Sequence, residues 1–161
     1  MKPTGTVEDG GKTLILRRHF PVPIGDVWAS VTESERLGRW FGTWTGDPAT
    51  GSVMVTMNAE PEAAAPARFE IDACEPPRLL AVSATDESGQ WKLVAKLTEV
   101  EGGTEFELRQ EDLVPGTASD TGPGWEWYLD RLVASVAGKQ PPTLADFETD
   151  YMPMSTAYGA M

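Results

Sequence analysis

Apolar and polar residues alternate through most of the chain, which is the pattern of strands that bury one face. In residues 67–74, for example, Phe69 and Ile71 alternate with Glu70 and Asp72. Because one face is apolar and the other charged in run after run, the pattern predicts an antiparallel sheet, with turns at DESG (86–89) and EGG (101–103). The predicted strands cover residues 13–20, 51–57, 67–74, 78–85, 90–100 and 104–113.

Two segments instead carry apolar residues every three or four positions, which predicts helices. The spacing of Ile24, Val27, Trp28 and Val31 predicts a short helix directly after the first strand. Thr32 and Glu35 have capping-box spacing, which predicts a second short helix through Leu37. A long amphipathic helix is expected from Trp125 to a stop at Gly138. Its apolar stripe is Trp125, Tyr128, Leu129, Leu132, Val133 and Val136, with Glu126, Asp130 and Arg131 on the opposite side.

This order of elements predicts an α+β fold, in which a curved antiparallel sheet of six or seven strands wraps around the C-terminal helix with an apolar cavity between them. A split α+β sandwich satisfies the same pattern. We expect residues 1–12 to be flexible, 13–139 to form one domain, and 140–161 to be a tail. The tail is too apolar to be free, so we expect it to dock on the domain or on a second subunit of a homodimer.

The charge balance limits the classes of partner. The chain has 13 Lys and Arg against 25 Asp and Glu, a formal charge of −12. Such a surface repels nucleic-acid phosphates and anionic lipid, so we expect neither nucleic acid nor a membrane as partner. No apolar run approaches 18 residues, no signal-peptide pattern begins the chain, and the single cysteine suits a reducing compartment. These features favour a cytoplasmic protein with Cys74 as a small buried residue.

The sequence has few residues suited to metal binding or to nucleophilic catalysis. His19 and Cys74 are the only imidazole and thiol, and no metal-ligand spacing occurs around them. His19 falls on the outward face of the first strand, away from the expected cavity. We therefore expect no metal, no cofactor and no assigned catalytic residue.

Residues 17–41, RRHFPVPIGDVWASVTESERLGRWF, resemble the opening segment of the START-like superfamily (SRPBCC, or polyketide cyclase/dehydrase-like). The matching positions are a basic residue at Arg17 or Arg18, a proline at Pro21 or Pro23, and then Val27, Trp28, Thr32, Glu33, Leu37, Arg39 and Trp40. Two later segments, EPPRLLAVSA and GWEWYLDRLVASVAG, are similar to the family's in the same order. The chain is most similar to the branch of the activator of heat-shock protein 90 ATPase, C-terminal type. The resemblance implies the helix-grip fold and an internal cavity.

Tryptophan is frequent, with six in 161 residues. In the resembled fold Trp40 and Trp44 would lie at the cavity mouth. Large aromatic side chains also fill ordinary cores, so both interpretations stand. The inward faces of the strands assign Val55, Met57, Phe69, Ile71, Trp91, Leu93, Phe106 and Leu108 to the cavity, capped by Trp125, Tyr128 and Leu132.

Two polar residues bear on a ligand site. Arg18 shares a strand face with Leu16 and Phe20, so we expect it to point inward and to need a partner. Asp112, which extends the inward face of the last strand, would be a structural partner; otherwise Arg18 would receive a ligand carboxylate or enolate. The Tyr128 hydroxyl would orient a ligand or reach water.

Three functional hypotheses follow. The first is a module that binds a small hydrophobic or aromatic molecule in the cavity. The second is a cyclase-type or other small-molecule enzyme in which Arg18 or Tyr128 polarises a carbonyl. The third is a co-chaperone-like interaction domain that acts through its surface. We favour the binder because no acid/base pair converges and no second chaperone-contact domain is evident.

Overall fold

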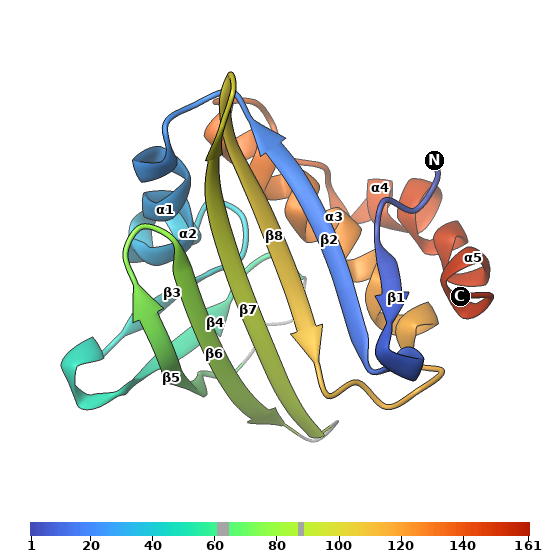
Figure 1. Ribbon diagram of the computed structural model, residues 1–161, viewed down its shortest axis with the longest axis horizontal. Coiled ribbons are helices and arrows are strands. Elements are labelled where there is room, and N and C mark those ends of the chain that lie inside the picture. Colours follow the sequence, from blue (N-terminus) through green and yellow to red (C-terminus); the bar gives the residue numbers. More distant parts are fainter. Residues whose placement is uncertain (61–64, 87–88) are drawn as a thin grey trace.

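The computed structural model describes residues 1–60, 65–86 and 89–161. The turn expected at 86–89 and the loop expected between 57 and 67 lie partly outside the described residues. The described residues form a curved, eight-stranded antiparallel sheet in the order β1-β2-β8-β7-β6-β5-β4-β3 (Figure 1). The strands are β1 (Thr6–Glu8), β2 (Thr13–Phe20), β3 (Gly42–Thr45), β4 (Ser52–Met57), β5 (Ala67–Glu75), β6 (Leu79–Asp86), β7 (Gly89–Val100) and β8 (Gly103–Glu111).

One long helix covers the concave face of the sheet, as the helix-grip prediction required, and α1 and α2 follow β2 (Figure 1). Helix α1 contacts β7, β8 and α3, and thus closes the sheet from a second side. The α-helices are α1 (Ile24–Thr32), α2 (Ser34–Leu37), α3 (Ala118–Val136), α4 (Leu144–Asp146) and α5 (Ser155–Gly159). Single turns η1 (Asp9–Gly11), η2 (Pro48–Thr50), the π-type η3 (Phe147–Tyr151) and η4 (Met152–Met154) complete the described elements.

The sheet has eight strands where six or seven were expected, and the two that the sequence did not predict, β1 and β3, lie at its two edges. Strand β1 is only three residues long and β3 only four, so neither shows enough alternation to be recognised in the sequence. The predicted capping box is also wrong. The N-cap of α2 is Glu33 with no side-chain cap, and the Thr32 hydroxyl instead donates to the carbonyl of Trp28 (2.7 Å).

Helix α3 begins at Ala118, seven residues before the predicted start at Trp125. Residues 116–124, GTASDTGPG, contain glycine and proline, which disfavour helix interiors. Packing outweighs that preference here, because Ala118, Gly122 and Pro123 are all buried. Glu126, expected on the exposed side, is also buried.

Both terminal segments pack on the flank of α3 that faces away from β7, as the neighbouring N and C ends in Figure 1 indicate. Residues 1–12 were expected to be flexible; in the structure Thr6–Glu8 pairs with β2 as strand β1. The tail packs on α3 of the same chain through α5, η3 and η4. Tyr151, Met154 and Tyr158 of the tail are buried by this packing.

A β-bulge in β5 changes which side chains face the helix. Ile71 pairs with Val82, but the next pair is Ala73 with Ala81, so one residue is left over on β5. Beyond such a bulge the side chains exchange faces. Cys74, paired with the inward-facing Leu80, therefore replaces Ala73 on the concave face.

Candidate functional site

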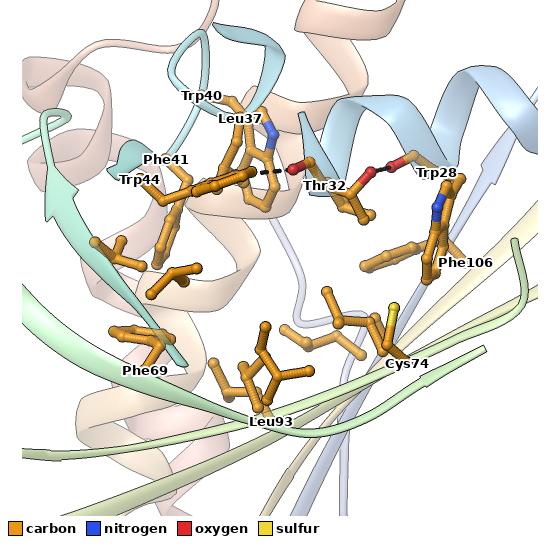
Figure 2. Close-up of a pocket in the computed structure, with 18 of the residues that line it drawn as sticks. Trp28, Thr32, Leu37, Trp40, Phe41, Trp44, Phe69, Cys74, Leu93 and Phe106 are labelled. Carbon is orange, nitrogen blue, oxygen red and sulfur yellow. Dashed lines mark hydrogen bonds between the residues drawn. The ribbon is translucent and has the colours of Figure 1, made fainter. Parts of the chain in front are cut away.

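An apolar cavity of about 330 Å³ lies between the sheet, helices α1 and α2, and α3; we call it the inner compartment. Figure 2 shows Trp28 and Thr32 of α1 above it, and Phe69, Leu93 and Cys74 of the sheet below. Its volume reaches the lower end of the range typical of ligand pockets, about 300–1,000 Å³.

The inner compartment offers almost no polar chemistry. Thr32 and Cys74 carry the only polar side-chain atoms besides the indole nitrogens among the described lining residues, and none of these residues is charged. The Thr32 hydroxyl is bonded to the carbonyl of Trp28. A ligand in this space would therefore be held by burial of apolar surface and by aromatic contact.

Three lining tryptophans direct their indole N–H groups into the protein. Trp40 donates to the carbonyl of Ser30 (2.8 Å), Trp44 to that of Thr32 (2.8 Å), and Trp125 to Oε1 of Gln110 (2.7 Å). These bonds fix the rings in place, and the Trp44 bond is drawn in Figure 2. The wall is thus pre-organised, and these rings present carbon rather than free donors to the cavity.

A second space of about 400 Å³, the outer compartment, adjoins the inner one at four shared residues: Phe41, Phe69, Leu93 and Trp125. It differs in chemistry, since Glu60, Thr85, Asp120, Thr121 and Tyr128 line it beside apolar groups. The two compartments are therefore neighbours that share part of a wall; the inner one is apolar and the outer one carries carboxylates.

Tyr128 lines the outer compartment, and its hydroxyl has a hydrogen-bond partner there. It donates to Oε2 of Glu60 (3.1 Å), while its ring packs on Phe41 and Trp125 with centroids 5.3 and 5.9 Å away. Burial, and then the neighbouring Glu60 carboxylate, raise the pKa of Tyr128 far above its ordinary value. The phenol therefore stays protonated at physiological pH and acts as a donor rather than as a base.

The residues expected to form the cavity occupy these compartments with two exceptions. Trp40, Trp44, Val55, Ile71, Phe106 and Leu108 line the inner compartment; Met57, Trp91 and Tyr128 line the outer; Phe69, Leu93 and Trp125 line both. Leu132 lines neither and is fully buried in the core. Arg18 is the second exception.

Arg18 faces inward on β2 but lies on the opposite flank of α3 from the cavity, which corrects its assignment as a ligand-binding residue. Its Nη2 binds Oε2 of Glu126 (2.8 Å) and its Nε binds Oδ1 of Asp130 (3.1 Å), both on α3. The expected partner Asp112 instead forms an exposed pair with Lys92 (3.1 Å). Asp112 has a left-handed backbone (φ 57°), so the strand alternation ends before it.

Sequence reasoning missed Phe41 and Cys74 as site residues. Phe41 precedes the unrecognised strand β3 and lines both compartments. Cys74 was expected to be buried; it is exposed and lines the inner compartment, because the bulge in β5 turns it there. The run RWF is a detectable aromatic signal for Phe41, whereas nothing in the sequence marks the bulge.

Two further properties bear on function. Within residues 1–60, 65–86 and 89–161, no three His, Cys, Asp or Glu side chains come together as a metal site would require. Of the helices described, none is both long and apolar enough to span a membrane.

Residues 21–137 match the family model described as "Activator of Hsp90 ATPase homolog 1-like protein". No curated protein matches the chain.

Solved structures similar to this chain include the crystal structure of CalU16 from Micromonospora echinospora, which is 28% identical with a TM-score of 0.70, covering 91% of this chain and 83% of that one. A solution structure of a Bordetella parapertussis protein has 23% identity and a TM-score of 0.74, covering 98% and 93%. DynU16, described as a putative protein in the dynemicin biosynthetic locus, has 20% identity and a TM-score of 0.69, covering 81% of this chain and 49% of that one. The last two similarities concern the fold alone.

Proposed function

The chain belongs to the family of activator of Hsp90 ATPase homolog 1-like proteins, within the START-like superfamily, and from this premise we propose that it binds a small hydrophobic or aromatic molecule between the sheet and α3. The observation that carries the proposal is the inner compartment, a preformed space whose described wall is apolar. Protein interiors are normally close-packed, and unfilled apolar space forfeits packing energy. A preformed apolar space of this size is therefore best explained by a ligand.

A cytoplasmic location is part of this proposal. Cys74 is the only cysteine, so the chain forms no internal disulfide, as is usual in a reducing compartment.

Filling the inner compartment tests the proposal. Ala95 lines the compartment, whereas Ala81 on β6 is paired with Val94 and does not line it. We expect the neutral dye Nile red to bind the unmodified protein with increased fluorescence. Ala95→Leu should weaken this binding at least about fivefold, because three added heavy atoms occupy the space. The matched control Ala81→Leu should bind the dye as the unmodified protein does.

Equal dye binding by Ala95→Leu and the unmodified protein would count against the proposal, provided both have the same thermal unfolding midpoint. Native mass spectrometry of protein purified from cells supplies a second readout. An adduct of small-molecule mass should be present in the unmodified protein and in Ala81→Leu, and depleted in Ala95→Leu.

The family description favours one further candidate, stimulation of a chaperone ATPase through the protein surface. That activity needs no cavity, so Ala95→Leu should stimulate Hsp90 ATP hydrolysis as well as the unmodified protein. The co-chaperone function would be favoured if Ala95→Leu still stimulates ATP hydrolysis and the unmodified protein binds no dye. The cyclase-type alternative has less support, because the described inner wall carries no carboxylate, imidazole or ammonium group.

A further inference from the structure

The outer compartment combines aromatic rings with carboxylates. Its aromatic lining residues are Phe41, Trp91, Trp125 and Tyr128. Glu60 lines it from the segment after β4, and Asp120 from the first turn of α3. The inner compartment has no charged residue among its described lining residues. Two neighbouring spaces thus differ in the chemistry of their walls, and they share Phe41, Phe69, Leu93 and Trp125.

The charged side chains that the structure describes in the wall of the outer compartment are carboxylates, those of Glu60 and Asp120. None of its described lining residues is Lys, Arg or His. The positive charge of Arg131 acts to lower the pKa of Tyr128, against the larger effects of burial and Glu60. The Arg131 guanidinium has other partners. It donates to the carbonyls of Trp40 (3.0 Å) and Pro142 (2.8 Å), and it stacks over the Trp127 ring at 4.9 Å. These hydrogen bonds go to main-chain carbonyls and not to Glu60 or Asp120, so the described Arg131 keeps its charge but is not ion-paired with either carboxylate.

One hydrogen bond connects the exposed Glu60 carboxylate to the ring cluster. The Tyr128 hydroxyl donates to one of its oxygens (3.1 Å), and the Tyr128 ring packs between Phe41, Trp125 and Trp127. A carboxylate has about four lone-pair sites, so Glu60 retains acceptor capacity beyond this bond. It can accept from a second donor without giving up Tyr128.

We propose that the outer compartment binds the cationic end of the ligand, an organic ammonium group, while the apolar or aromatic body of the same molecule occupies the inner compartment. The inference rests on the proposed function and specifies its ligand class. Aromatic faces attract organic cations through their ring quadrupole, and carboxylates add charge-assisted hydrogen bonds. The formal charge of −12 further concentrates cations near the protein.

A matched series of probes tests the charge preference. The compounds are 1-naphthylmethylammonium, 1-naphthylmethanol and 1-naphthoate, which share one aromatic body and differ in the charge of one substituent. Binding is measured by calorimetry and by displacement of Nile red. We expect the ammonium compound to bind about tenfold or more tightly than the alcohol, and the carboxylate to bind most weakly. The advantage of the ammonium compound should shrink as salt is added.

Two variants that each remove one carboxylate charge test whether the ammonium group binds in the outer compartment. Glu60→Gln and Asp120→Asn keep the shape of each side chain, and each should weaken the ammonium probe at least about threefold while leaving the alcohol within twofold. Glu101→Gln is the matched control. Glu101 is exposed in the turn between β7 and β8 and lines neither compartment. Its substitution changes the net charge by the same amount and should leave the affinities for the ammonium and alcohol probes unchanged.

The outcomes separate this inference from the proposed function. Equal affinity for the three probes, or preference for naphthoate, with Nile red still bound in the inner compartment, overturns the cation inference and leaves the hydrophobic-binding proposal intact. An equal loss of affinity for the ammonium probe in Glu101→Gln and Glu60→Gln also overturns it, because the effect would then come from net charge and not from the outer compartment. Absence of binding by Nile red and by all three probes overturns both.

Discussion

Glu126 accepts hydrogen bonds from three parts of the chain that are distant in sequence. Its carboxylate receives the N–H of Thr4 (2.6 Å), the N–H of Gly5 (3.1 Å) and Nη2 of Arg18 (2.8 Å), together with the Tyr158 hydroxyl. A buried charge of this kind is tolerated only because it is paired and fully bonded. At the scale of a single residue, this carboxylate fastens both terminal segments to α3.

The Glu126→Gln variant should therefore be strongly destabilised. A glutamine offers one acceptor oxygen where the carboxylate offers two, and its amide group would face donors. Since Arg18 would lose a buried partner, we expect the free energy of unfolding to fall by about 3 kcal/mol. Denaturant unfolding at pH 7 measures the change. An unchanged midpoint would contradict the bonding described for Glu126.

The pH dependence of stability gives an independent check on the same residue. Burial alone would raise the pKa of Glu126, but hydrogen bonds from Tyr158, Arg18 and Thr4 outweigh it and hold the pKa below the ordinary 4.5. The unfolded chain thus binds the proton first as pH falls. The stability from Glu126 is full above about pH 4.5 and is lost as pH falls through the lower folded pKa. Glu126→Gln should lack this component of the acid-side loss.

At the scale of elements, α3 and α5 approach closely because position 122 has no side chain. A Cβ placed on Gly122 would lie 2.5 Å from atoms of the Tyr158 ring, whereas one on Gly124 would meet nothing within 4 Å. The two glycines lie in the same helix two residues apart, so they share helix propensity but differ in packing.

Alanine at these two positions should have opposite effects. Gly124→Ala should raise the free energy of unfolding by up to about 1 kcal/mol, as helix propensity dictates. Gly122→Ala should lower it by about 1–3 kcal/mol, because α5 must shift to avoid overpacking. Thermal or urea unfolding of both variants makes the comparison. Similar stabilisation by the two substitutions would mean that α5 does not pack on Gly122.

At the scale of the whole molecule, the C-terminal tail covers the flank of α3 opposite the cavity. Trp127 donates its indole N–H to the carbonyl of Thr143 (3.0 Å), and its ring packs on Phe147 at a centroid distance of 5.7 Å. Tyr151 donates to Oδ2 of Asp130 (2.7 Å). One flank of α3 thus serves stability while the other lines the proposed site.

Removal of the tail, residues 140–161, should expose this flank. Loss of the buried Tyr151, Met154 and Tyr158 side chains should cost at least about 4 kcal/mol of unfolding free energy, at about 1.5–3 kcal/mol each. The exposed apolar surface should also promote self-association. Calorimetry and size-exclusion chromatography check both effects. A truncated chain that keeps the oligomeric state and the unfolding midpoint of the full chain would show that the tail contributes nothing.

The periodicity of the sequence was sufficient to predict the antiparallel sheet, its apolar face and the helix that covers it. The alternation of Trp91, Leu93 and Ala95 on β7 and the stripe containing Trp125 and Tyr128 each survive in the fold. These features follow from local rules, since side chains repeat every 2 residues in strands and every 3.6 in helices. That part of the cavity wall was therefore readable from the chain alone.

Only the tertiary structure decided which inward-facing side chains meet the cavity and which meet the other flank of α3. Arg18 shares its strand face with apolar residues, yet it pairs with Glu126 because β2 lies beside the terminal segments. The bulge that turns Cys74 inward and the packing that extends α3 through Pro123 depend on partners far along the chain. Local patterns specify faces, whereas the pairing of those faces depends on contacts between distant segments.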